Sequence, residues 1–223
     1  MAGRLASDQV TTLCHRWGRL IEVATAYKTF LNREVLVGLD RSCPSDFFVA
    51  QTTHTLLVIY YSFLYSLFDS KGVSFITATG NLRTELPPEA WEAREKAMGH
   101  WKSIEKQMML VRHKIGFHGE DNYKGLELGY EQYRNINPLL PELVMMYLAA
   151  FFRFVHLYYD VKGPMANPPT KESAHWLLNA AKETESESAE LLALDPREVV
   201  DDVIKTLQET VAKRRRNKGS DSQ

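Results

Sequence analysis

The sequence predicts an all-α protein, an antiparallel four-helix-type bundle followed by two additional C-terminal helices. Apolar residues recur every three or four positions along four long segments, which is the period of an amphipathic α-helix. Glycine and proline gather between these segments, at the places where helices begin and end. Strands have little support in this pattern. We therefore expect helices packed on helices around one core.

Composition predicts a folded protein in which any charged binding site is small rather than spread over a long surface. The chain has 223 residues and 44% apolar content, enough for a hydrophobic core and too much for a disordered protein. A net charge of −1 argues against a long basic surface for nucleic acid but permits a small phosphate site. Cys14 and Cys43 form neither a metal-ligand spacing nor a disulfide framework, and the first residues lack a signal-peptide core. We expect a cytoplasmic protein.

Two apolar segments raise the alternative of a membrane protein. Residues 56–68 are fewer than the about 20 needed to cross a bilayer. Residues 143–161 are long enough, but they include Arg153 and His156, which are costly in hydrocarbon. A central bundle helix is also apolar all round, so we expect a buried helix and no membrane.

The first predicted helix follows Ser7, whose side chain can cap it. Its buried face consists of Val10, Leu13, Trp17, Leu20, Ala24, Tyr27 and Leu31. A second, richly apolar helix follows "GLDRSCPSD", with Ser45 or Asp46 as the cap. The sequence "DSKG" marks its end near Asp69.

Two more long helices are predicted further along the chain. Residues 73–86 have no helical period and predict an irregular connector. Pro87 and Pro88 suit the first turn of a third helix, which we expect to stop at Gly116. The apolar stripe of this helix consists of Trp101, Ile104, Met108, Val111 and Ile115.

The glycine-rich segment 116–137 predicts a loop, with a short turn as an option. Asn137 and Pro138 then open a fourth helix that runs to about Tyr159.

Beyond the fourth helix the composition changes, which predicts a division of the chain. The expected parts are a helical bundle (1–161), a linker rich in proline (162–170), a C-terminal helical appendage (171–213) and a disordered basic tail (214–223). The appendage is expected to contain two amphipathic helices, over residues 171–193 and 196–213. They either pack on the bundle or serve in association.

The segment "MLVRHKIGFHGED" holds the strongest candidate for a functional site. Val111 lies on the core face of the third helix, so Arg112 stands at the edge of that face. Gly116 is a residue type that ends helices, so the chain can turn there and bring His118 towards Arg112. The helix break makes a joint site of these two side chains feasible.

An arginine and a histidine without a metal or a protein nucleophile suit the cleavage of RNA. A neutral imidazole can take the proton of a ribose 2′-hydroxyl, while a guanidinium holds the scissile phosphate. The RNA supplies its own nucleophile, so we expect no cofactor and no metal, and DNA would be spared.

These residues also carry a resemblance to a known family. "RHKIGFH", from Arg112 to His118, resembles the Arg-x4–6-His signature of the HEPN superfamily, helical proteins many of which are metal-independent endoribonucleases. The segment "YSFLYSLFDSKGVSF" (61–75) looks like the end of the second helix in the abortive-infection branch, where an Asp precedes a break. "REKAMGH", from Arg94 to His100, has the same spacing but lies within a helix, and we interpret that match as accidental.

The resemblance implies a homodimer in which the motifs of two subunits meet in one cleft, with Arg112 and His118 as the catalytic pair. His113 is the polar residue that commonly follows the arginine in this family, and Lys114 and Asp69 are expected to support the site. The expected function is endoribonuclease activity of a toxin or antiviral effector. RNA is the expected partner, and an antitoxin or another protein partner is a further candidate.

Simpler interpretations remain open at this point. Arg112 and Lys114 could serve only as cations at a helix C-terminus, where the free carbonyl groups favour positive charge. Asp69 could cap the second helix or accept a hydrogen bond from the cluster, and capping is favoured. The alternative function is a non-catalytic HEPN-like module that binds a nucleotide, RNA or a protein.

Overall fold

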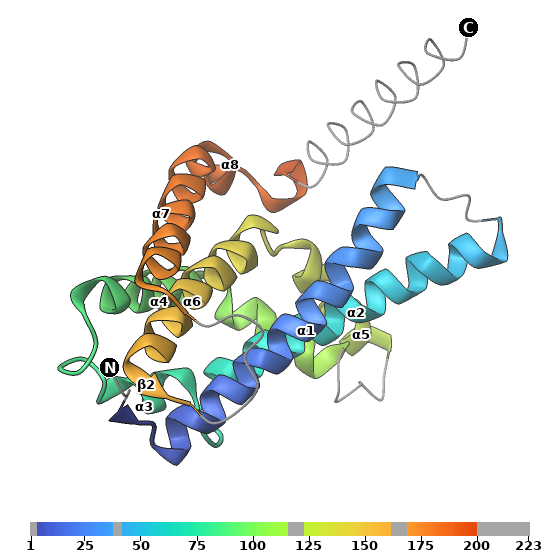
Figure 1. Cartoon of the computed structure of the whole chain (residues 1–223). Coiled ribbons are helices and arrows are strands. Elements are labelled where there is room, and N and C mark those ends of the chain that lie inside the picture. The colour runs from blue at the N-terminus through green and yellow to red at the C-terminus, as the bar shows by residue number, and fades with distance from the viewer. Residues whose placement is uncertain (1–3, 38–41, 116–122, 162–168, 200–223) are drawn as a thin grey trace, which may run out of the picture.

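The computed structural model describes residues 4–37, 42–115, 123–161 and 169–199, and this part of the chain is predominantly α-helical, as predicted. The helices are α1 (Asp8–Val37), α2 (Pro44–Phe68), α3 (Phe75–Gly80), α4 (Pro88–Lys114), α5 (Tyr123–Arg134), α6 (Leu139–Tyr158), α7 (Lys171–Glu187) and α8 (Ala189–Ala193) (Figure 1). Two short strands, β1 (Arg4–Leu5) and β2 (Tyr159–Asp160), form one parallel pair that the sequence did not predict.

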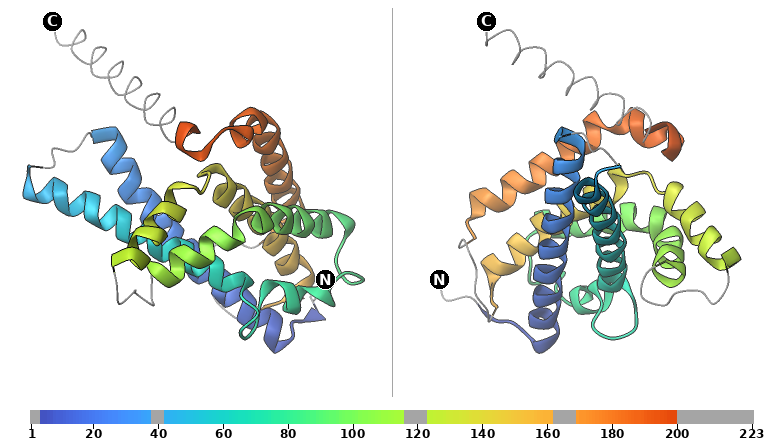
Figure 2. Two further views of the ribbon diagram at one scale, coloured as in Figure 1. Left: turned by 180° about the vertical axis from the view of Figure 1, so that it is seen from behind. Right: turned by 90° about the vertical axis from the view of Figure 1, so that its right-hand side faces the viewer.

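α1 and α2 pack side by side as an antiparallel pair, and their connected ends project from the body of the molecule (Figures 1 and 2). The side chain of Ser7 caps α1, as predicted, and its Oγ accepts a hydrogen bond from the Val10 N–H at 3.3 Å. The predicted cap of α2 was wrong. Cys43 is the N-cap, and Pro44 takes the first helical position, where its fixed φ and missing N–H cost nothing.

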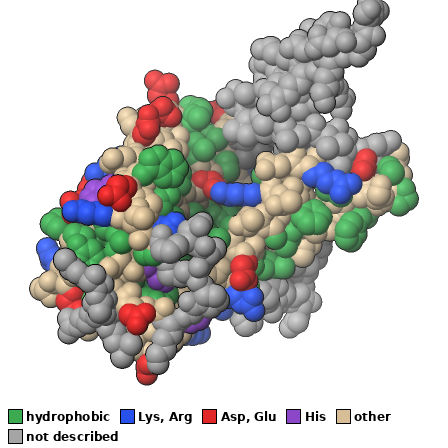
Figure 3. Space-filling view, viewed as in Figure 1, with side chains coloured by type: hydrophobic (Ala, Val, Ile, Leu, Met, Phe, Trp, Pro, Cys, Tyr) green, Lys and Arg blue, Asp and Glu red, His purple; other side chains and the backbone are tan. Residues whose placement is uncertain are grey.

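The projecting end of this pair keeps apolar side chains on the surface, some of which are visible in the space-filling view (Figure 3). Phe47 is 52% exposed and Phe48 is 65% exposed, both near the start of α2.

α4 and α6 make the most extensive helix pair of the bundle, and both begin where the sequence predicted. Pro87 is the N-cap of α4, and Pro138 is the N-cap of α6. The Asn137 side chain accepts a hydrogen bond from the Leu139 N–H at 3.0 Å, which satisfies one of the free donors of that first turn.

Two segments predicted to be irregular contain helices. The predicted connector 73–86 contains α3, which has too few residues to show a helical period but is held by a capping box between Ser74 and Thr77. The predicted loop 116–137 contains α5, and its glycines concealed that helix from the sequence pattern.

Gly129 shows why a glycine stands within α5. A Cβ atom at this position would lie 2.7 Å from both Ile115 Cγ1 and Lys114 Cβ. The missing side chain lets α5 pack directly against the end of α4.

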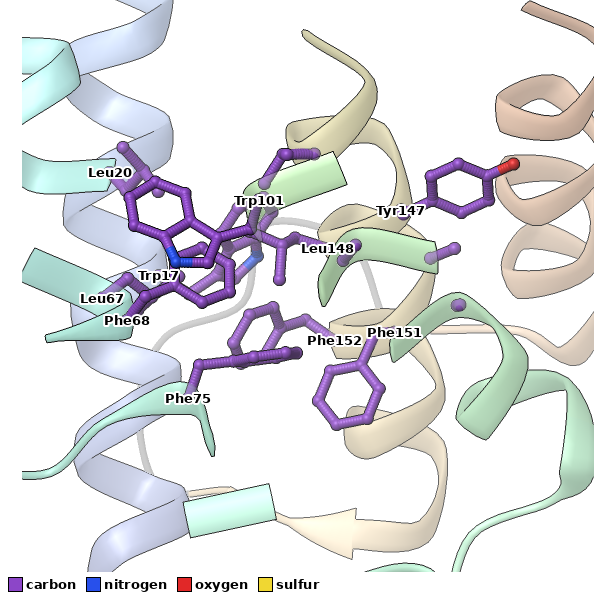
Figure 4. Packing of buried hydrophobic residues seen from close by; sticks show 14 of the residues in the cluster. Trp17, Leu20, Leu67, Phe68, Phe75, Trp101, Tyr147, Leu148, Phe151 and Phe152 are labelled. Atoms are coloured by element: carbon purple, nitrogen blue, oxygen red, sulfur yellow. The ribbon is translucent and has the colours of Figure 1, made fainter. Parts of the chain in front are cut away.

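A cluster of aromatic rings joins the helices at the centre of the molecule (Figure 4). Trp17 of α1 stacks on Phe152 of α6 with ring centroids 4.9 Å apart. Phe68 at the end of α2 stacks on Trp101 of α4 at 4.4 Å. Phe75 of α3 contacts Phe68 edge-on at 5.2 Å, so α2, α3 and α4 are fixed against one another.

Two described helices, α2 and α6, are long and apolar enough to cross a membrane by length and composition alone. α2 is longer than the apolar stretch 56–68 that the sequence suggested was too short. In the most apolar window of α6, 56% of the residues are buried inside the structure. A buried core helix passes the same test, so the expectation of no membrane contact stays a prediction.

α7 lies against α6 and also contacts α4. At their junction, the Glu185 carboxylate accepts hydrogen bonds from the Tyr147 hydroxyl and, at 3.0 Å, from the Lys96 ammonium. Its Oε1 also lies 3.2 Å from His100 Nε2. Burial alone would raise the pKa of Glu185, but these hydrogen bonds and the positive charges lower it overall.

The predicted division of the chain is not decided by this packing. The linker residues 162–168 and the segment 200–213 lie outside the described residues, as does the tail 214–223. The boundaries therefore stay a prediction.

Replacing Glu185 by Gln should lower the free energy of unfolding by about 1–3 kcal/mol at neutral pH, because a half-buried charged acceptor is lost. A depressed pKa makes this contribution complete above the ordinary value of 4.5 and removes it as the pH falls further. Urea unfolding at neutral pH and at a pH below 4.5 measures the difference. The exposed Glu183→Gln variant is the control. An equal effect in both variants would contradict a stabilising role for the hydrogen bonds of Glu185.

Candidate functional site

The candidate site lies where α2 and α4 end beside one another. Arg112, in the last turn of α4, donates a hydrogen bond from Nη1 to Asp69 Oδ2 at 3.1 Å. The two side chains are only 21% and 15% exposed, so this ion pair is largely removed from water. Sequence reasoning named both residues, and the structure brings them together.

Asp69 has both of the roles that the sequence left open. It is the C-cap of α2, and its N–H donates to the Tyr65 carbonyl at 3.0 Å. Its Oδ1 accepts from the Lys71 N–H at 3.2 Å, while Oδ2 binds Arg112. Gly72 follows with φ +99°, a left-handed conformation that glycine adopts without strain.

The Tyr65 ring packs against Arg112 and His113, and the sequence did not single it out. The Arg112 Cζ lies 5.1 Å from the ring centroid, within the range of a cation–π contact. The His113 ring meets Tyr65 edge-on at 6.2 Å. Burial, with a smaller contribution from the Asp69 charge, raises the pKa of Tyr65, while Arg112 opposes that rise. Tyr65 lies one turn before Asp69, so an (i, i+4) spacing could have identified it.

Arg16 of α1 is the second arginine near Asp69, and sequence reasoning missed it as well. Its two terminal nitrogens donate hydrogen bonds to the carbonyl oxygens of Ser66 and Val73. Burial lowers the pKa of Arg16, Asp69 raises it, and Arg112 lowers it. The signal in the sequence is its position directly before the core residue Trp17, at the edge of the buried face of α1.

The local charge is positive. Two arginines surround one aspartate, and His113 and Lys114 follow Arg112 in the last turn of α4. His113 is exposed, and Lys114 is partly buried where α5 packs on α4. The free carbonyl groups of a helix C-terminus favour such cations, so these residues also stabilise the end of α4.

The catalytic partner predicted for Arg112 is not part of this geometry. His118 lies outside the described residues, as do the neighbouring Glu120 and Asp121. The pairing of Arg112 with His118 stays a prediction.

The second Arg–His match lies within the unbroken helix α4, and its two residues have separate environments. Arg94 is buried, donates from Nε to Thr79 Oγ1 at 2.7 Å and lies 4.4 Å from the Trp91 ring centroid. It therefore holds α3 against α4. His100 instead lies beside Glu185, and burial lowers its pKa.

Other histidines have packing contacts in the structure. His54 stacks on Tyr130 at 6.0 Å, and His175 meets Phe154 edge-on at 5.3 Å. His156 is partly buried, and burial followed by a neighbouring arginine lowers its pKa. Among the described residues, no group of three or more His, Cys, Asp or Glu side chains is arranged to hold a metal ion.

Comparison with known proteins gives no family for this chain. No family model matches the sequence, and no curated protein or solved structure matches it. The resemblance to the HEPN superfamily therefore depends on the residues of the sequence itself.

The Arg112–Asp69 pair should show a coupling energy of about 1–3 kcal/mol in a double-mutant cycle, because both side chains are mostly buried. The cycle compares Arg112→Met, Asp69→Asn and the double variant by urea unfolding. The exposed pair Arg19 and Glu22 is the matched control, and its coupling should be much smaller because water screens both charges. Equal coupling in the two pairs would contradict a dry ion pair at the site.

Proposed function

We propose that this chain is a metal-independent endoribonuclease of the HEPN type, which cleaves RNA by attack of a ribose 2′-hydroxyl on the adjacent phosphate. The single observation that supports this function best is the position of Arg112. Its side chain, 21% exposed, lies at the end of α4 and is held by an aspartate, six residues before His118 in the sequence.

Arg112 has the chemistry required to bind the scissile phosphate. A guanidinium presents several N–H donors in one plane, and the contact to Asp69 uses a donor of one terminal nitrogen. The remaining charge at the site is still positive because Arg16 lies close to the same carboxylate. A phosphate would thus meet an attractive site that is already ordered, which lowers the entropy cost of binding.

His118 is assigned the proton transfer. A neutral imidazole accepts the 2′-hydroxyl proton, the 2′-oxygen attacks phosphorus as the bond to the 5′-oxygen breaks, and the leaving 5′-oxygen takes a proton from water. The products are a 2′,3′-cyclic phosphate and a 5′-hydroxyl. Arg112 stabilises the charge that develops on the phosphate during this step.

The HEPN resemblance also supports a bundle core, a dimer and a biological role. α1, α2, α4 and α6 would form the four-helix core of the HEPN bundle, and two copies of the chain would place their sites in one cleft. The biological role would be that of a toxin or an antiviral effector in the cytoplasm, controlled by an antitoxin or another protein partner.

One observation favours a second candidate, a non-catalytic HEPN-like module that binds RNA, a nucleotide or a protein. Asp69 already neutralises Arg112, and a largely buried ion pair of this kind can hold two helix ends together without any chemistry. In this case His118 would have no role in turnover.

Purified full-length protein should cleave single-stranded RNA in the presence of EDTA and leave 2′,3′-cyclic phosphate ends, detected by sequencing of the end-labelled products. Arg112→Ala and His118→Ala should each lower kcat by about 10²–10⁴-fold, the size expected for a lost acid–base or phosphate group. Arg19→Ala, with its surface pair to Glu22, is the control and should keep full activity.

The outcomes separate the two candidates. RNA binding that persists without any product would select the non-catalytic module. Full activity in the double Arg112→Ala, His118→Ala variant would refute the site and the HEPN-type mechanism, because cleavage would then come from other residues or from a contaminating nuclease.

A further inference from the structure

Arg16 connects α1 to both sides of the turn that carries Asp69. One terminal nitrogen donates to the Ser66 carbonyl, three residues before Asp69, and the other donates to the Val73 carbonyl, four residues after it. Arg16 is itself partly buried. Its guanidinium therefore ties the last turn of α2 to the start of the segment that leads into α3.

Arginine is the side chain that suits this position. Its two terminal nitrogens are held apart in one rigid plane, so each can reach a different carbonyl oxygen. A lysine at this position would bring its donors to a single point. The two oxygens belong to residues seven positions apart in the sequence, so one planar group fixes the width of the turn.

The turn that carries Asp69 also fixes Arg112. Asp69 binds Arg112 through Oδ2, and its own Oδ1 is held by the Lys71 N–H within the same turn. The two arginines repel one another, whereas Asp69 attracts both. Phe68 and Phe75 hold the two ends of the turn in the core. Without Arg16, the turn would keep these contacts but lose its anchor to α1, and the carboxylate between them would be less restrained relative to Arg112.

We infer that Arg16 is a positioning residue for Arg112, acting through the turn that carries Asp69. This role is a matter of geometry and does not depend on whether the chain cleaves RNA. Its consequence for turnover depends on the proposed function, because there Arg112 must meet the scissile phosphate.

The direct test uses ¹⁵N NMR of the Arg112 guanidinium in the full-length chain, assigned by the signals lost in Arg112→Lys. Hindered rotation keeps the two terminal nitrogens of an anchored guanidinium distinct, whereas a free guanidinium gives one averaged signal. The wild type should give distinct signals, and Asp69→Asn should give the averaged one. Arg16→Met and Arg16→Lys should also give the averaged signal, although both keep an unbranched side chain of similar length.

Arg19→Met is the matched control, since Arg19 lies one turn further along α1 and makes a surface pair with Glu22. It should leave the Arg112 signals distinct. Distinct, unchanged signals in folded Arg16→Met or Arg16→Lys would overturn the inference, and so would failure of both Arg16 variants to fold, because Arg16 would then serve the fold as a whole.

Turnover provides a second readout that a general structural role would not produce. Arg16→Lys should lower kcat for RNA by about 10- to 100-fold in the wild-type background and should cause little further loss in Asp69→Asn. Equal losses in both backgrounds would contradict action through Asp69. If the wild type cleaves no RNA while the NMR result is as expected, the nuclease is refuted and the positioning role is kept.

Discussion

The stacking of Phe68 on Trp101 is the contact on which the candidate site depends. These rings lie 4.4 Å apart and join the last residue of α2 to the middle of α4. Because Asp69 is the next residue in the chain, the same contact places its carboxylate beside α4. Phe75 packs on Phe68 from the other side of the turn, so the aromatic core holds both ends of the segment that contains Asp69.

The polar site is therefore an extension of the core rather than a feature of a loop. Arg112 lies next to the fully buried Val111, and its charge is satisfied by Asp69 within a largely dry environment. Such an arrangement is costly to build unless the partners are held in place. A preorganised guanidinium at the edge of the bundle is what binding of a phosphate requires, and it equally explains why these two helix ends stay together.

The long helices could be predicted because each depends on local sequence: apolar period, proline starts and the "DSKG" ending. The Arg112–Asp69 contact joins residues 43 positions apart, and only the HEPN resemblance named Asp69 as a supporting residue. α5 could not be predicted, because Gly129 weakens helix propensity and is explained only by its close approach to Ile115. Arg16 escaped prediction for a related reason. Its partners are backbone carbonyl groups far along the chain, and no side-chain pattern records such contacts.

The most direct test of the proposed nuclease is a crystal structure of the chain bound to an RNA whose scissile ribose lacks its 2′-hydroxyl, which blocks cleavage. We expect one phosphate within about 3 Å of both the Arg112 guanidinium and the His118 imidazole, the reach of a hydrogen bond. A structure that places His118 in a separate environment from Arg112, or RNA on another face of the molecule, would contradict the proposal.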